Sequence, residues 1–170
     1  MQFNSILIMQ ILKKETYIKM IENSIGTRLF NSIIVTEYDI QKDILNDGEF
    51  SCACFVSGIL FLQNVIPRTR TTVTNLEKDL LENPLMDEVA MPKNIQVGDI
   101  IFWESVTYED GSSNRHVGFA LSNIQAVSTN YIQKCVVRHS MNTAIENTGE
   151  VRKIERVFRP FFDRTVAQLE

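Results

Sequence analysis

Apolar positions in the first third of the chain follow the spacing of helices and turns. Between residues 6 and 24 they recur at roughly helical intervals, at Ile8, Ile11, Leu12, Ile18 and Ile21. This pattern predicts a first helix, and Gly26 follows it as a stop signal. Residues 29–37 (LFNSIIVTE) are apolar and β-branched, which predicts a strand or an extended arm. Asp47 and Gly48 then mark a turn.

Two further helices are predicted in the middle of the chain. Residues 52–64 carry a long apolar side, and Ser51 stands directly before them as a favourable N-cap residue. Residues 75–82 (NLEKDLLE) form a short helix with Asn75 as its capping residue. Pro84 lies beyond the end of that helix, where it cannot continue the helical hydrogen bonds.

The second half of the chain changes to short runs that are typical of strands. Gly98 and Asp99 open the first run, and Gly-containing or polar clusters separate several of the others. Five strands are predicted, over residues 100–104, 116–122, 125–130, 135–140 and 151–158. Because the helices come first and the strands second, the predicted class is α+β with an antiparallel sheet, rather than a parallel βαβ arrangement.

Length and composition fit one ordinary globular domain. The 170 residues are 44% hydrophobic and 22% charged, and a chain of this size buries a core without the help of disulfides or metal ions. We predict one domain over residues 1–170. In it, residues 1–45 form an N-terminal helical and extended segment that packs on the rest, and residues 64–74 form a connecting loop. The odd count of three cysteines does not indicate a disulfide framework, and a reducing compartment is the simplest environment.

Charge and the N-terminal segment narrow the classes of function. The net charge is −4 and no Lys/Arg cluster stands out, so the basic footprint of a nucleic-acid-binding protein is missing. Residues 1–12 lack a basic segment and a small-residue cleavage site, so no signal peptide is expected. No apolar run reaches the ~18 residues of a membrane span, so no membrane association is expected. The predicted location is cytoplasmic as synthesised, with signal-independent release left open.

Cys52 occupies the first position of the second predicted helix. Backbone N–H groups and the helix dipole converge there, which lowers the pKa of a thiol and stabilises a developing oxyanion. Cys54 lies ~200° further around the helix, so the two thiols cannot share one face. If Cys52 points into a cleft, Cys54 points into the core. An interpretation of both thiols as buried small hydrophobic side chains also stays open.

His116 follows a polar loop and opens a strand, a position that is both rigid and accessible. Its imidazole is suited to accept the proton of a thiol. A third group is needed to orient the ring, and Ser128 and Asn130 share one face of a neighbouring predicted strand. Asn130 carries the better acceptor, a carboxamide oxygen. For all three, ordinary strand-end polarity remains an alternative. His139 is by default a structural histidine, with a second ring-orienting residue or a substrate contact as the alternatives.

Three blocks in this order resemble the signature of the NlpC-type peptidase family. They are residues 51–56 (SCACFV), 98–103 (GDIIFW) and 116–119 (HVGF). The family has an Asp-Cys-Ser-Gly-like block at a helix start, then a Gly-Asp-apolar-apolar-aromatic strand, then His-Val-Gly opening the next strand. The resemblance covers about residues 45–140. It implies a papain-like fold, with the cysteine helix packed on the antiparallel sheet, and hydrolysis of amide bonds, usually in cell-wall peptides.

The resulting functional hypothesis is a cysteine hydrolase. Cys52 is the nucleophile and His116 the general base in a thiolate–imidazolium pair, and the reaction passes through a thioester. Asn130 or Ser128 orients the imidazole. The expected substrate is a peptide, as in an endolysin-like peptidoglycan amidase or thiol protease, and no cofactor or metal is expected. The oligomeric state is not specified by the sequence.

Three departures from the family pattern motivate other hypotheses. Ser51 replaces the usual Asp, and Cys54 replaces a small Gly. Ser128 stands where the family commonly has its third polar residue, often a His. A catalytically degenerate binding module on the same fold is therefore one alternative, and acyl transfer to an acceptor other than water is another. A zinc site is disfavoured because no C-x-x-C pair exists and a helical C-x-C diverges.

Overall fold

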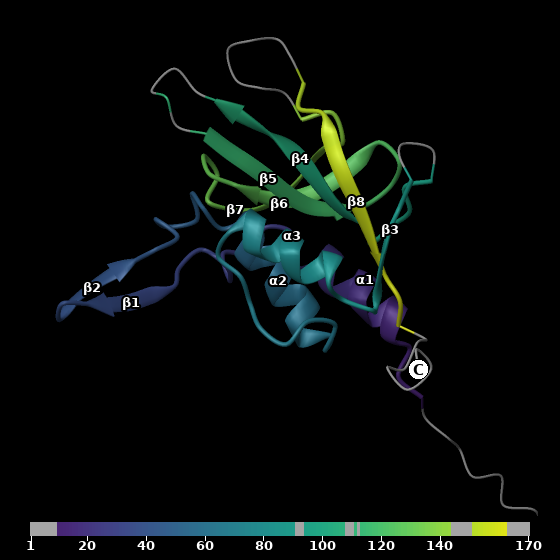
Figure 1. The fold of residues 1–170 in the computed structure, drawn as a ribbon, viewed down its shortest axis with the longest axis horizontal. Coiled ribbons are helices and arrows are strands. Elements are labelled where there is room, and N and C mark those ends of the chain that lie inside the picture. The colour runs from purple at the N-terminus through teal and green to yellow at the C-terminus, as the bar shows by residue number, and fades with distance from the viewer. Residues whose placement is uncertain (1–9, 91–93, 108–110, 112, 144–150, 163–170) are drawn as a thin grey trace, which may run out of the picture.

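The chain folds into a layer of helices against one antiparallel sheet in a computed structural model that describes residues 10–90, 94–107, 111, 113–143 and 151–162 (Figure 1). The helices are α1 (Lys13–Asn23), α2 (Cys52–Leu62) and α3 (Val73–Leu81). In Figure 1 they lie together on one side of the sheet. The α+β class predicted from the order of helical and extended patterns is confirmed.

The main sheet has six strands in the order β3-β8-β4-β5-β6-β7, and every neighbouring pair is antiparallel. The strands are β3 (Met86–Glu88), β4 (Ile100–Thr107), β5 (Ser113–Ala120), β6 (Gln125–Asn130), β7 (Cys135–Ser140) and β8 (Ile154–Pro160). Strands β4 to β7 follow one another in space as in sequence. The C-terminal strand β8 pairs with β4 and separates it from β3.

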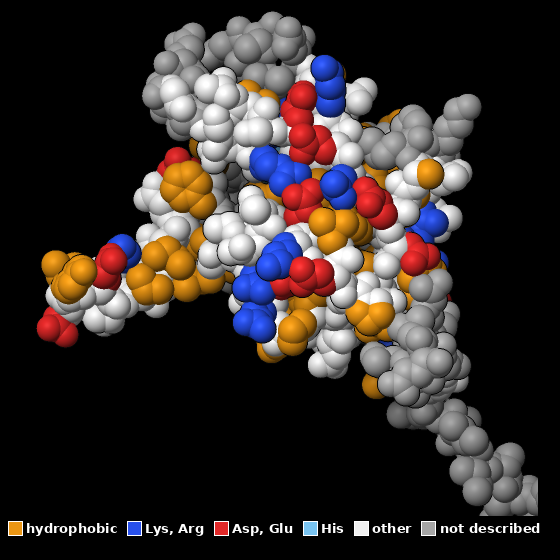
Figure 2. All heavy atoms as spheres, in the orientation of Figure 1, with side chains coloured by type: hydrophobic (Ala, Val, Ile, Leu, Met, Phe, Trp, Pro, Cys, Tyr) orange, Lys and Arg blue, Asp and Glu red, His pale blue; other side chains and the backbone are white. Residues whose placement is uncertain are grey.

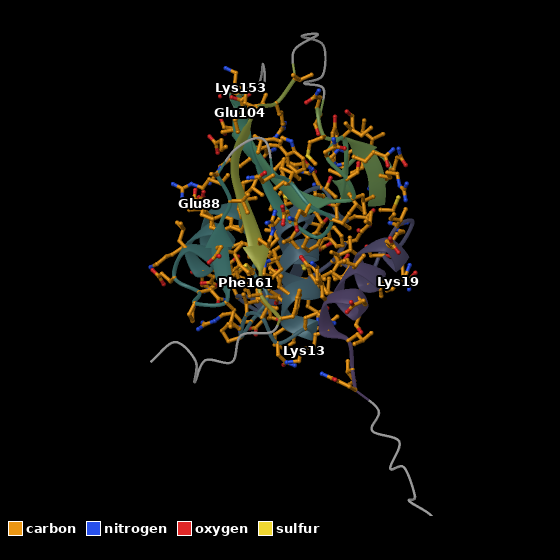
Figure 3. All side chains as sticks on the ribbon, turned by 90° about the vertical axis from the view of Figure 1, so that its right-hand side faces the viewer. Lys13, Lys19, Glu88, Glu104, Lys153 and Phe161 are labelled. Atoms are coloured by element: carbon orange, nitrogen blue, oxygen red, sulfur yellow. The ribbon has the colours of Figure 1, made fainter. Side chains whose placement is uncertain are left out.

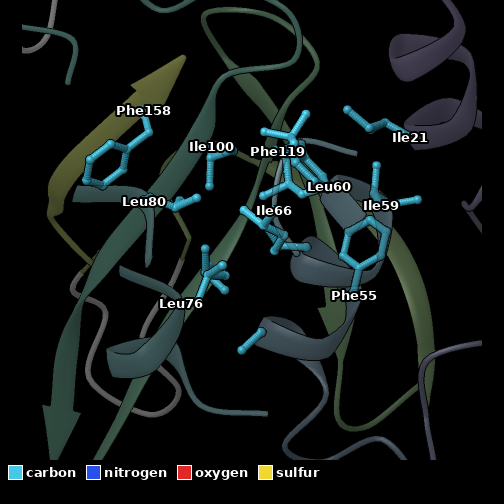
Figure 4. Packing of buried hydrophobic residues seen from close by; sticks show 14 of the residues in the cluster. Ile21, Phe55, Ile59, Leu60, Ile66, Leu76, Leu80, Ile100, Phe119 and Phe158 are labelled. Carbon is cyan, nitrogen blue, oxygen red and sulfur yellow. The ribbon is translucent and has the colours of Figure 1, made fainter. Parts of the chain in front are cut away.

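The core lies between α2 and one face of the sheet. Residues 53–60 of α2 are all buried, so this helix is apolar around its whole circumference. Figure 4 shows Phe55 and Leu60 among side chains of the sheet, and the Phe55 and Phe119 rings meet edge to face at 5.4 Å. Each buried side chain of this size stabilises the fold by about 1.5–3 kcal/mol. The start of α2 is therefore held firmly against β5.

Helix α1 is anchored to the same core by Tyr17. Its ring packs edge to face on Phe119 at 5.7 Å, and its hydroxyl donates a hydrogen bond of 2.7 Å to the carbonyl oxygen of Gly98. Gly98 has φ +88°, a left-handed conformation that favours glycine. Its position directly before β4 lets the N-terminal helix and the sheet meet closely.

A two-stranded hairpin projects from the body of the molecule. It consists of β1 (Ile34–Glu37) and β2 (Ile40–Asp43), and Figure 1 shows it extending away from the sheet. Its turn residue Tyr38 is 93% exposed, and Figure 2 shows apolar side chains along the projection. The first strand of this arm, β1, lies within the segment 29–37 that was predicted as a strand or extended arm, and the second strand, β2, was not predicted.

Several helix boundaries differ from those predicted. Residues 6–9 of the predicted first helix lie outside the described residues, and the helix itself begins at Lys13. Helix α3 begins two residues before the predicted start, because Thr72 and not Asn75 is its N-cap. Thr72 Oγ1 accepts a hydrogen bond from the Asn75 backbone N–H at 3.3 Å.

Within the described residues, none of the helices combines the length and the apolar character needed to cross a membrane.

Candidate active site

Cys52 is the first residue of α2, as the sequence predicts, and is partly buried. Ser51 is the N-cap, but its hydroxyl donates to the carbonyl oxygen of Gly48 at 2.7 Å and does not cap the helix. The helix-start N–H groups therefore stay available to the cysteine. The N–H groups of Cys52 itself and of Ala53 both lower the pKa of the thiol by hydrogen bonding. Cys54 is only 6% exposed, as expected for a thiol that points into the core.

A cleft of about 810 Å³ opens beside Cys52. Its walls come from the segment before α2, the start of α3 and the facing ends of β4 and β5. Hydroxyl side chains contribute much of the lining, at Thr71, Thr72, Thr74, Ser105 and Ser113. Phe50 and Tyr131 add aromatic surface. A volume of this size accommodates a short peptide segment, and the lining offers hydrogen bonds to its amide groups.

The sulfur of Cys52 lies against strand β5. Burial raises the pKa of this thiol, and the nearby backbone N–H of Val117 offsets part of that rise. Strands β5 and β6 are in register only at Phe119–Val127 and Ala120–Ala126, so their pairing stops before Val117. The thiol therefore sits at the residue next to His116, where the two strands part.

His116 faces away from α2, as the alternation with the buried Val117 requires. Its Nε2 atom lies 2.7 Å from Ser128 Oγ, and the same Oγ lies 2.8 Å from Nε2 of His139. The second histidine ends the chain of contacts, with its Nδ1 atom 2.8 Å from the carbonyl oxygen of Ser140. Among the described side chains no hydrogen bond joins Cys52 directly to His116. Catalytic hydrogen bonds often tighten only when substrate is bound.

Trp103 covers both imidazoles. Its ring centroid lies 5.5 Å from that of His116 and 5.6 Å from that of His139. The indole is fully buried and donates from Nε1 to the carbonyl oxygen of Met141 at 3.0 Å. Trp103 thus packs against both imidazoles and belongs to the core, not to the cleft wall.

Gly118 allows Ser128 to reach the histidine. A Cβ atom at this position would lie 2.5 Å from the carbonyl oxygen of Val127 and 2.9 Å from the Cβ of Ser128. No side chain fits into that space without moving the β6 backbone. The glycine of the His-Val-Gly block therefore has a steric role, since it brings β6 close enough for the contact between Ser128 and His116.

Asn130 was the stronger candidate for orienting the His116 ring because of its carboxamide. The structure does not place it there. Its Oδ1 atom accepts hydrogen bonds from the backbone N–H groups of Ile132, at 3.0 Å, and Gln133, at 2.8 Å. This is an Asx-type turn that connects β6 to β7. Of the two proposed ring-orienting residues, the structure brings Ser128 to His116. His139, for which a structural role was the default and a second orienting role an alternative, contacts Ser128 because the fold brings β7 alongside β6.

Burial is the largest influence on the pKa values of Cys52 and His116. Burial raises the pKa of the Cys52 thiol, and the surrounding N–H groups offset only part of the effect. Burial, followed by the charges of His139 and Arg152, lowers the pKa of His116 to about 3. Both directions favour the neutral forms. The resting pair expected from the sequence, thiolate and imidazolium, is therefore disfavoured relative to thiol and neutral imidazole.

Arg152 is the cation that acts on both groups. Its charge lowers the pKa of Cys52 and that of His116. The guanidinium donates to the carbonyl oxygen of Asn114, a residue of the cleft wall, at 3.0 Å. Its neighbour Lys153 is held to β4 by a backbone hydrogen bond of 2.8 Å to the Glu104 carboxylate (Figure 3). Positive charge is thus fixed at the rim of the cleft.

No three His, Cys, Asp or Glu side chains gather as metal ligands in the part of the chain that the structure describes. Comparison with models of known protein families and with curated protein sequences finds no match to this chain. The chemistry of Cys52, His116 and their neighbours is then what bears on function.

Proposed function

We propose that the chain is a cysteine hydrolase of the NlpC type that cleaves an amide bond. One observation carries the proposal: Cys52, at the start of α2, lies close enough to strand β5 for the backbone N–H of Val117, the residue directly after His116, to act on the pKa of its thiol. Nε2 of the same histidine lies 2.7 Å from Ser128 Oγ. A helix-start thiol, a neighbouring imidazole and a third group that orients the ring are the parts of a cysteine nucleophile site.

In the proposed reaction, His116 takes the thiol proton at Nδ1, the ring nitrogen that Ser128 does not occupy. The sulfur attacks the carbonyl carbon, and helix-start N–H groups stabilise the oxyanion. Collapse of the tetrahedral intermediate breaks the C–N bond, and the imidazolium gives its proton to the leaving amine. Water, deprotonated by His116, then attacks the thioester and releases the carboxylic acid. Because both groups are neutral at rest, proton transfer accompanies the attack and does not precede it.

The cleft suits a peptide substrate better than a strongly charged one. Its hydroxyl lining offers donors and acceptors for amide groups. Arg115, although it lines the cleft, is held by Glu77 at 2.6 Å and Glu155 at 2.8 Å, so its charge is already neutralised. Resemblance to the NlpC-type family adds the narrower proposal that the peptide belongs to a peptidoglycan-type cell wall.

The test is cleavage of defined cell-wall peptide fragments, followed by mass spectrometry of the products. Wild type should release a new amine and a new carboxylic acid, and Cys52→Ala should release neither. Cys135→Ala is the matched control, because this partly buried thiol lies on β7 and should be dispensable. Addition of an amine acceptor distinguishes hydrolysis from acyl transfer, since both pass through the same thioester.

A binding module without turnover is the second candidate. The raised pKa of Cys52 and the missing direct hydrogen bond to His116 both favour it. In that case the peptide fragments should bind to wild type and to Cys52→Ala with the same affinity, and no product should form. Isothermal titration beside the cleavage assay separates the two candidates.

A further inference from the structure

We propose that His139 is a positioning residue that acts through Ser128 and keeps Nδ1 of His116 unprotonated. This deepens the proposed function and rests on it for its catalytic meaning. The contact chain supplies the geometry: His116 to Ser128 at 2.7 Å, Ser128 to His139 at 2.8 Å, and His139 to a backbone carbonyl at 2.8 Å.

The carbonyl oxygen of Ser140 determines which groups donate and which accept in this series of hydrogen bonds. A carbonyl oxygen only accepts hydrogen bonds, so Nδ1 of His139, 2.8 Å away, must carry the proton. Thr143 Oγ1 lies 3.2 Å from the same nitrogen and serves as a second acceptor. A neutral imidazole has one N–H, so the remaining nitrogen of His139, Nε2, is a bare acceptor.

Ser128 determines the tautomer of His116 through the same pattern of donors and acceptors. Its hydroxyl has one hydrogen, which is donated to Nε2 of His139 at 2.8 Å. Its oxygen then accepts from Nε2 of His116 at 2.7 Å. With the proton of His116 on Nε2, its Nδ1 carries a lone pair. This is the nitrogen that must accept the thiol proton of Cys52.

The reverse order of donors and acceptors is unfavourable at both His116 and His139. Were Ser128 to donate to His116, the proton of that ring would sit on Nδ1 and the ring could not act as a base toward Cys52. Nε2 of His139 would then carry the other proton, and its bare Nδ1 would face the lone pairs of the Ser140 carbonyl at 2.8 Å. Two acceptors at this distance repel each other.

A serine alone could not set this direction, because a hydroxyl both donates and accepts. His139 supplies what Ser128 lacks, a partner whose own tautomer is fixed. The rings are kept neutral by burial, which lowers the pKa of both histidines, and Trp103 packs on both. The charged group that acts on His116 beyond this pair is Arg152.

Nitrogen-15 NMR of the whole labelled chain tests the assignment directly, because there are only two histidines. Two-bond proton–nitrogen correlations at neutral pH should show the Nε2–H tautomer for His116 and the Nδ1–H tautomer for His139. The spectra of His116→Gln and His139→Gln assign the signals. Two Nε2–H rings, or a charged ring at neutral pH, would overturn the proposal.

Substitutions add the functional readout. The tautomer signal of His116 should become mixed in Ser128→Ala and in His139→Leu, and stay fixed in His139→Gln, whose amide oxygen still accepts from Ser128. Acylation of Cys52 by an activated ester should fall roughly 10- to 100-fold in the first two variants, the usual effect of losing an outer-shell partner. Ser57→Ala is the control, since it removes a buried hydroxyl that bonds to Arg70.

These readouts separate the two proposals. Predicted tautomers without acylation in wild type would support the role of His139 on the ring and contradict the hydrolase. Acylation in wild type that is unchanged in His139→Leu, with a mixed tautomer in neither variant, would support the hydrolase and overturn the role of His139.

Discussion

Cys52 lies beside Val117, the residue directly after His116, and the backbone N–H of Val117 partly offsets the rise that burial causes in the pKa of the thiol. The relationship depends on two features of the fold. Residues 53–60 of helix α2 are all buried, and the pairing of β6 with β5 ends before this point. The fold thus places Cys52 beside the strand that carries His116, although the two residues are 64 positions apart in sequence.

Gly118→Ala should disrupt the contact between Ser128 and His116 without changing either residue. The added methyl group meets the Val127 carbonyl oxygen at 2.5 Å, so β6 must move and Ser128 must leave His116. We expect a loss of about 1–3 kcal/mol in the free energy of unfolding, measured by urea denaturation, and loss of the fixed tautomer of His116.

Gly26→Ala is the control for this prediction. Its φ of +83° makes alanine costly by about 1–2 kcal/mol, but open space surrounds it, so the site should stay intact. Equal tautomer signals in the two alanine variants would contradict the steric role of Gly118.

The stability of the fold should depend on pH through His116. Its pKa is about 3 in the folded chain and about 6.5 when unfolded, so its contribution is complete above pH ~6.5 and lost as pH falls toward 3. Wild type should lose up to about 1.4 kcal/mol per pH unit over this window from this group. Urea midpoints of wild type and His116→Gln should converge as pH is lowered; parallel curves would show that the ring is not buried as described.

Alkylation of Cys52 should be slow at neutral pH. Because burial raises the pKa of this thiol, its labelling by iodoacetamide should increase with pH at higher values than for a free cysteine, whose pKa is ~8.5. Removing the charge of Arg152, which lowers the thiol pKa, should shift the profile further upward in Arg152→Gln and leave it nearly unchanged in Arg152→Lys. Labelling faster than that of a free thiol at neutral pH would instead establish a thiolate–imidazolium pair.

The anchor of α1 can be tested by paired tyrosine substitutions. Tyr17 is 1% exposed and its hydroxyl donates to Gly98, whereas Tyr38 is 93% exposed at the tip of the arm. Tyr17→Phe should lower the free energy of unfolding by about 1 kcal/mol, and Tyr38→Phe should leave it unchanged. Equal unfolding midpoints would show that the Tyr17 hydroxyl contributes nothing.

Local patterns predicted much of this fold. Strands β6 and β7 have the residue bounds expected from their polar and apolar sequence, and Cys52 begins a helix as predicted. The short strand β3 was missed because three residues carry too little periodicity, and its pairing with β8 joins distant segments. Capping by Thr72 was missed because Asn75 is an equally good candidate by residue type.

The candidate site was predictable only in part. Sequence reasoning placed Ser128 and Asn130 on one strand face and favoured Asn130 for its carboxamide, whereas the structure brings Ser128 to His116. The choice depends on competition: Asn130 is used by its own turn, and the space left by Gly118 admits Ser128. His139 lies on β7, whose register against β6 brings it near Ser128, and that register follows from tertiary packing.

Trapping of a covalent acyl-enzyme tests the central claim most directly. Wild type would be mixed with the activated ester p-nitrophenyl acetate, quenched in acid, digested and examined by mass spectrometry, beside Cys52→Ala and His116→Gln. We expect one acetyl group on Cys52 in wild type, none at that position in Cys52→Ala, and strongly slowed labelling in His116→Gln. Acetylation spread over lysines and the other thiols, at the same rate in all three proteins, would contradict a nucleophilic Cys52 activated by His116.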